Sequence, residues 1–110
     1  MLIRSQDKTA VVNVDNVFDI GTRDINGATA ICIGSSSSFR NIAEYSTKAK
    51  ALKVLDMIQE AYADEKLVDY TVYSQQKEIE KMDNSTILAL RNELMKKAVF
   101  QMPEDGSVEV

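Results

Sequence analysis

The residues best suited to holding a phosphate and a base gather around position 40. Gly34 and a run of four serines precede Phe39 and Arg40. The backbone amides and hydroxyls of such a loop can cradle a phosphate. An arginine can hold the same group through two hydrogen bonds, and an aromatic ring can stack on a base. We therefore take Ser36, Phe39 and Arg40 as candidate ligand-binding residues. The alternative is a plain flexible loop, followed by a phenylalanine that belongs to the core.

Two other polar groups could complete such a site. Arg4 begins a dense run of donors and acceptors, Arg4-Ser5-Gln6-Asp7-Lys8, where we expect the first turn. This run could form one wall of a polar pocket, or it could be a solvated hairpin with an internal ion pair. Arg91 and Asn92 are neighbours in an expected helix, where Arg91 would hold a phosphate and Asn92 would read a base edge. A solvated helix face is the alternative for these two.

The sequence carries no recognisable catalytic or metal-binding motif. Histidine is absent, which removes the Ser-His and Cys-His dyads and the common zinc sites. No Walker loop, GxGxxG, GxSxG or HExxH motif is present. The single cysteine, Cys32, lies in an apolar run and is expected to be a buried hydrophobe. We predict no catalytic residue, no metal and no cofactor, and we keep a carboxylate-based nuclease or phosphodiesterase as the enzymatic alternative.

One acidic row has ligands that would suit a divalent metal ion. Asp56, Glu60 and Asp64 recur every four residues on an expected helix. A tight divalent site usually takes ligands from more than one element. We therefore expect this row to be a solvated stripe.

Composition narrows the class of partner. The chain has 110 residues, 45% of them hydrophobic and 27% charged, which fits one globular domain. Its net charge is -4 and neither half is basic, so duplex nucleic acid is not an expected partner. No apolar run approaches the ~20 residues of a membrane span, and the N-terminus lacks a signal-peptide core. We therefore expect no membrane partner and a cytoplasmic location.

The hydrophobic periodicity predicts an α+β fold, in which an N-terminal antiparallel β-meander is packed by two C-terminal α-helices and followed by a short final strand. The Asn26-Gly27 pair predicts a hairpin turn, and Ser46 is the expected N-cap of the first helix. We expect a single domain (1–110) that begins with a sheet over 1–45 and a helix over 46–65. An uncertain connection follows over 66–82, in which residues 67–73 look strand-like. The chain then forms a helix over 83–98, a strand over 99–103 and a frayed acidic tail over 104–110.

Three segments resemble a group of short proteins from Firmicutes and their phages. They are the opening Met1 to Lys8, the stretch Glu44 to Leu52, and the ending Val99 to Pro103. The order of strands and then helices is also similar to the phage Thoeris anti-defence sponges, which bind cyclic ADP-ribose signals and cyclic oligonucleotides without cleaving them.

The resemblance implies a phage anti-defence protein. Such a protein would sequester a cyclic nucleotide immune signal in the cytoplasm of an infected host cell. Because one chain of 110 residues has little interior to spare, we expect a homo-oligomer, a dimer or higher, with the nucleotide held between protomers. No residue of the sponge family's binding site can be matched to a position in this chain. The alternative is a protein-binding inhibitor of a host defence enzyme, such as an anti-CRISPR.

Overall fold

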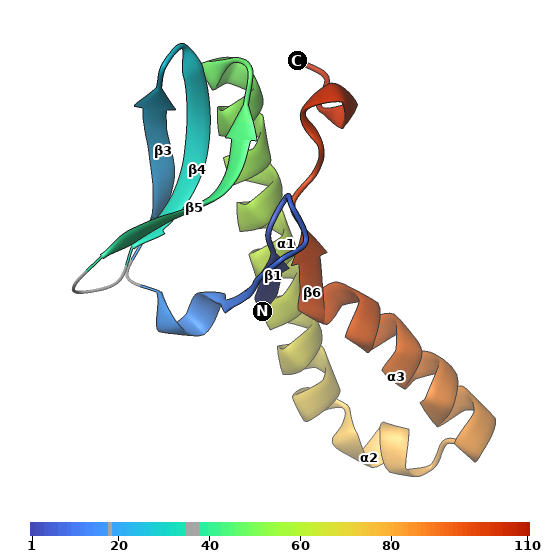
Figure 1. The fold of residues 1–110 in the computed structure, drawn as a ribbon. Coiled ribbons are helices and arrows are strands. Elements are labelled where there is room, and N and C mark those ends of the chain that lie inside the picture. The colour runs from blue at the N-terminus through green and yellow to red at the C-terminus, as the bar shows by residue number, and fades with distance from the viewer. Residues whose placement is uncertain (18, 35–37) are drawn as a thin grey trace.

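A computed structural model describes residues 1–17, 19–34 and 38–110, with only the backbone described at residues 95–97. In this part of the chain, the protein forms two three-stranded sheets, one long helix and several shorter helices (Figure 1). The predicted α+β class, with its antiparallel meander and short final strand, is confirmed.

The larger sheet is the predicted meander. It consists of β3 (Asp19–Ile25), β4 (Ala28–Gly34) and β5 (Phe39–Tyr45), in the order β3-β4-β5. The expected hairpin turn joins β3 to β4, and its two residues, Asn26 and Gly27, have φ values of +46° and +89°. Both angles lie in the left-handed region that this kind of turn requires. Ile25 therefore pairs with Ala28 and the register of the hairpin is fixed.

The smaller sheet joins the two ends of the chain, which sequence reasoning did not foresee. β1 (Leu2–Arg4) lies between β2 (Val11–Asn13), with which it runs antiparallel, and β6 (Val99–Gln101), with which it runs parallel. A 3-10 turn, η1 (Val14–Asn16), follows β2. The two sheets meet where the backbone N–H of Gln6, just after β1, donates to the Ile42 carbonyl of β5 at 2.9 Å.

The first helix, α1 (Lys48–Ser74), is longer than predicted. The strand-like assignment of residues 67–73 is wrong, because these residues are helical. No glycine or proline interrupts the helix, so its backbone hydrogen bonds continue despite the β-branched and aromatic side chains. The expected N-cap at Ser46 is also wrong. Thr47 is the cap, and its hydroxyl accepts from the Lys50 amide at 3.2 Å.

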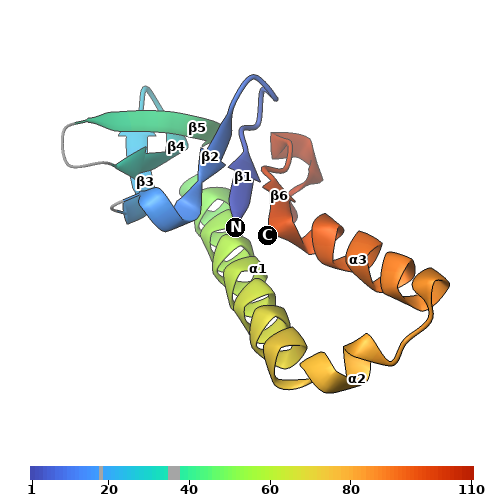
Figure 2. The same cartoon turned by 90° about the horizontal axis from the view of Figure 1, so that it is seen from below.

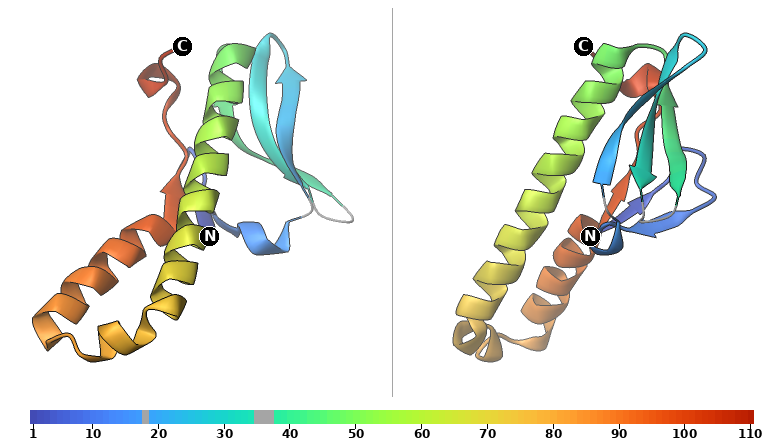
Figure 3. Two further views of the ribbon diagram at one scale, coloured as in Figure 1. Left: turned by 180° about the vertical axis from the view of Figure 1, so that it is seen from behind. Right: turned by 90° about the vertical axis from the view of Figure 1, so that its left-hand side faces the viewer.

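Only the first half of α1 packs on the sheets. Its buried residues, Ala51, Val54 and Ile58, join a core that includes Ile31 and Tyr45. Beyond this half, α1 continues into α2 (Gln76–Glu80) and α3 (Asn84–Ala98), which lead back to β6. We call residues 63–98 the helical arm, because they project away from both sheets (Figures 2 and 3).

The start of α3 agrees with the sequence-based expectation. Asp83 caps this helix, and its Oδ1 atom accepts from the Thr86 amide at 2.7 Å. Those hydrogen bonds to Thr86 hold the pKa of Asp83 below its usual value, so the cap stays charged.

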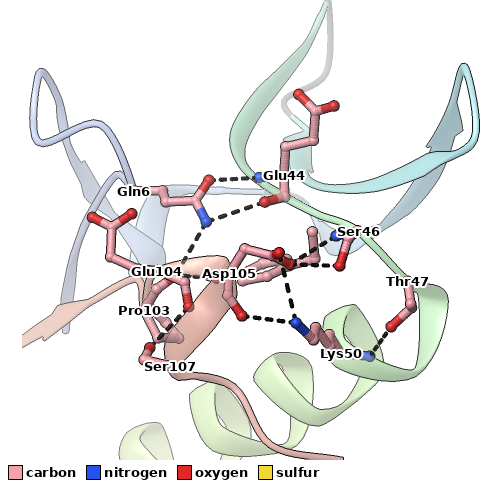
Figure 4. A network of polar contacts seen from close by, with 10 residues as sticks. Gln6, Glu44, Ser46, Thr47, Lys50, Pro103, Glu104, Asp105 and Ser107 are labelled. Carbon is pink, nitrogen blue, oxygen red and sulfur yellow. Dashed lines mark hydrogen bonds and ion pairs between the residues drawn. The ribbon is translucent and has the colours of Figure 1, made fainter.

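The C-terminal tail is docked, so the prediction that residues 104–110 fray is wrong. The short turn η2 (Asp105–Ser107) precedes Val108, which is buried against the core. The Asp105 carboxylate accepts from the Ser46 amide at 2.8 Å and from its hydroxyl at 3.1 Å (Figure 4). Lys50 donates to the Asp105 carbonyl at 3.0 Å. The tail therefore stabilises the connection between β5 and α1.

Candidate functional site

A polar pocket lies between the turn after β1 and the strand β5. Its volume is about 550 Å³, within the range of small-molecule sites. Residues 5–10 form one wall and residues 40–44 form the other. The lining residues are Ser5, Gln6, Asp7, Thr9, Ala10, Arg40, Asn41, Ile42, Ala43 and Glu44.

The wall formed by residues 5–10 is a turn held by its own side chains. One oxygen of Asp7 accepts from the Ser5 hydroxyl at 2.7 Å, the Thr9 hydroxyl at 2.6 Å and the Thr9 amide at 3.0 Å. These hydrogen bonds, led by that from the Thr9 hydroxyl, lower the pKa of Asp7 to about 2. Asp7 is therefore charged at neutral pH. Lys8 has a φ of +66°, an uncommon value for a residue with a side chain, which this hydrogen bonding supports.

Arg4, the last residue of β1, contacts this turn but does not line the pocket. Its guanidinium donates to the Lys8 carbonyl, at 3.2 Å from Nη2 and 3.4 Å from Nε. The ion pairs found among the described residues include none within this turn, so the expected internal ion pair is replaced by hydrogen bonds. Arg4 thus braces the turn, and sequence reasoning could not distinguish bracing from ligand binding.

Gln6 joins three separate segments, and the sequence analysis did not single it out. Its side-chain oxygen accepts from the Glu44 amide at 2.8 Å. Its side-chain nitrogen donates to the Glu44 carbonyl and to the Pro103 carbonyl, both at 3.1 Å (Figure 4). The side-chain amide of Gln6 therefore connects the turn to β5 and to the C-terminal tail through hydrogen bonds.

The wall formed by β5 carries the side chains that remain free for a ligand. Arg40, Asn41 and Glu44 are exposed. Within the described residues, the Arg40 guanidinium forms no hydrogen bond and no ion pair. In Figure 4 the Glu44 carboxylate points away from the polar network around Gln6. The lining residues from β5 thus include an exposed arginine, an exposed asparagine and an exposed glutamate.

The five predicted binding residues that the structure describes do not converge within one chain. Arg40 lines the pocket, whereas Phe39, at the start of β5, is 71% exposed and lies outside the lining. Arg91 and Asn92 are exposed on α3, in the arm that extends away from β5 (Figure 1). Arg4 is used in the turn, and Ser36 lies outside the described residues. Phe39 is therefore a surface residue and not part of the core.

Three further possibilities among the described residues are a reactive cysteine, a metal-binding cluster and a membrane-spanning helix. Cys32 is buried, as expected, with its sulfur 3.7 Å from the Gly21 carbonyl oxygen. In residues 1–17, 19–34 and 38–110 no cluster of three or more His, Cys, Asp or Glu could hold a metal ion, and the row of Asp56, Glu60 and Asp64 is exposed. No helix in this part of the chain has the length and apolar character needed to cross a bilayer.

Comparison with protein-family models, curated proteins and solved structures finds no match for this chain. The case for a function therefore depends on the geometry of the pocket and on the exposed surfaces.

Proposed function

We propose that the protein binds a nucleotide-type ligand in the pocket between residues 5–10 and β5, and that it holds this ligand without transforming it. The observation that carries the proposal is the exposed Arg40, which acts on Asp7 through its charge but forms no hydrogen bond or ion pair among the described residues. Asn41 and Glu44 belong to the lining of the same pocket of about 550 Å³. An arginine suits a phosphate through paired hydrogen bonds. A carboxylate suits ribose hydroxyls, as in dinucleotide-binding folds. A side-chain amide can pair with a base edge.

A binding protein that lacks histidine and releases no product would act by sequestration, in proportion to its concentration. We propose that the ligand is a cyclic nucleotide immune signal and that the chain is a phage anti-defence protein acting in the infected host cell. The motifs that resemble Firmicutes and phage proteins support this role.

A paired substitution tests the pocket. Binding of a cyclic nucleotide panel, including cyclic ADP-ribose isomers, would be measured by isothermal titration calorimetry. Arg40→Ala should weaken binding about tenfold to a hundredfold, since a charged hydrogen bond contributes about 1.5–3 kcal/mol. Arg91→Ala, on the exposed face of α3, should leave affinity unchanged. The reverse result would move the site to the arm, and no binding by the unsubstituted protein would overturn the proposal.

A second candidate function is a protein-binding inhibitor of a host defence enzyme, and the arm favours it. Leu67, Tyr70 and Tyr73 are 63%, 69% and 79% exposed on the second half of α1. Tyrosine is enriched in protein interfaces because it buries a large ring and keeps a polar end. Inhibition of candidate host nucleases that is lost in Tyr70→Ser/Tyr73→Ser and kept in Arg40→Ala would favour this candidate.

A further inference from the structure

The outer edge of β3 is open. β3 ends the sheet order β3-β4-β5, and none of the described strands pairs with its outer side. In Figures 1 and 3 no other element lies beside this edge. An open strand of seven residues presents a row of backbone donors and acceptors that can pair with another strand.

The two faces of β3 differ in character. Ile20 and Thr22 pair with the buried Ile33 and Ile31, so they lie on the face that packs on α1. Asp19 and Arg23 lie on the opposite face. Both are exposed, and neither has an ion-pair partner in the part of the chain described.

An apolar groove opens beside this edge. It has a volume of about 360 Å³ and lies between β3 and the first half of α1. Its lining is mostly apolar: Val14, Ile20, Leu55, Ile58, Gln59 and Tyr62. A strand added to β3 would place alternate side chains over this groove and cover it.

The charges on β3 complement a second copy of β3. In an antiparallel pair, only registers that match odd with odd positions keep both α1 helices on the same face of the joined sheet. The register centred on Gly21 then places Asp19 opposite Arg23 of the second copy, and Arg23 opposite Asp19 of that copy. It also places Ile20 beside Thr22 of the second copy, over the groove. Moving the centre to Thr22 would place Asp24 opposite an isoleucine and lose both charge pairs.

We propose that two copies of this chain associate through antiparallel pairing of their β3 edges, centred on Gly21. The product is a continuous six-stranded sheet in the order β5-β4-β3-β3-β4-β5, with the two α1 helices on one face. The pockets beside β5 then lie at the two outer ends of this sheet. The proposal is independent of the ligand, because β5 and β3 are opposite edges of the meander.

Charge reversal tests the register. Sedimentation velocity of the full chain should give a species of 24.6 kDa, twice the 12.3 kDa of one chain. Asp19→Arg should weaken the dimer by about tenfold or more, since both cross-strand pairs become Arg–Arg contacts. Arg23→Asp should do the same through two Asp–Asp contacts. Glu60→Arg, which makes the same change of charge as Asp19→Arg but on an exposed part of α1, should leave the dimer intact.

Mixing the two reversed chains gives the most specific result. A chain with Asp19→Arg and a chain with Arg23→Asp should form a heterodimer with both charge pairs restored, although each variant alone dimerises at least about tenfold more weakly than the unsubstituted chain. The double variant Asp19→Arg/Arg23→Asp should again be a homodimer. Circular dichroism of each variant establishes that it folds. A monomeric unsubstituted chain, or a dimer that ignores both reversals, would overturn the proposal.

Discussion

The first half of α1 and the helical arm have different surroundings, although residues 63–74 of the arm are the second half of the same helix. The first half is covered by the meander and the docked tail, and buries Ala51, Val54 and Ile58 completely or nearly so. The arm has no buried residue among those whose side chains are described, and Leu67, Tyr70 and Tyr73 are open to solvent. Helical structure alone therefore does not indicate a packed core.

The boundary between the two regions is a polar cluster around the N-terminus. The Met1 ammonium lies 3.1 Å from Glu65 and 3.3 Å from Asp15. Burial by itself would lower the pKa of this ammonium, but the two carboxylates outweigh it and the pKa is raised. Tyr62 also donates to Asp15 at 3.3 Å. Beyond this cluster, α1 leaves the core.

The largest expected difference between the two regions is in the cost of truncating an aliphatic side chain. Ile58→Ala should reduce the free energy of unfolding by about 2–5 kcal/mol, because it opens a cavity in the core. Leu67→Ala, at a 63% exposed position of the same helix, should change it by less than about 0.5 kcal/mol. Urea denaturation would measure both. A comparable cost at Leu67 would mean that a partner covers the arm.

The next effect concerns the connections that hold the packed region together. Gln6→Ala removes three hydrogen bonds and should cost about 1–3 kcal/mol, since the backbone groups of Glu44 and Pro103 lose a partner. Gln6→Glu is the matched control, because it keeps an acceptor for the Glu44 amide but has no donor. Its melting temperature should lie between those of the unsubstituted chain and Gln6→Ala. Equal stability of all three chains would contradict the bridging role.

A smaller effect should separate local from global opening. Ala89→Gly, on the exposed face of α3, should cost that helix about 1 kcal/mol. Because the arm has few buried contacts, we expect faster amide exchange, about fivefold, confined to the arm and no change in global unfolding. Hydrogen exchange read by mass spectrometry would detect this. Ala51→Gly, in the packed half, should instead lower the stability of the whole chain.

The smallest effect is the response to acid, which should arise in the packed region. Hydrogen bonds from Ser46 lower the pKa of Asp105 and those from Thr9 and Ser5 lower that of Asp7. A carboxylate whose pKa is lowered on folding stabilises the protein above its unfolded value, about 3.9, and this contribution is lost as the pH falls through the folded value. Asp105→Asn should therefore lower the melting temperature at pH 7 and flatten its decline between about pH 5 and pH 2. An unchanged profile would contradict the account of the tail.

Local signals in the sequence predicted the hairpin at Asn26-Gly27, a helix that begins near residue 46 and a second helix that begins near residue 83. Each depends on residues close to one another along the chain. The same local signals failed at residues 67–73, where β-branched and aromatic residues favoured a strand, whereas the helix that begins at Thr47 simply continues. They also failed at the tail, because docking depends on Ser46 and Lys50, more than fifty positions away.

The candidate site likewise combines local features that the sequence indicates with distant contacts that it does not. Arg40 and the turn at residues 5–10 were each noticed as polar segments, but nothing local predicted that they face each other across one pocket. Gln6 was missed because the two partners of its side chain, Glu44 and Pro103, lie on β5 and beyond β6. The absence of histidine, the fold class and the helix-forming and turn-forming segments were determined by the sequence itself, since they depend on composition and on nearby residues. The pairing of β1 with β6, the docked tail, the pocket beside β5 and the open edge of β3 were decided only by tertiary structure, because each brings together, or leaves unpaired, groups that are distant along the chain.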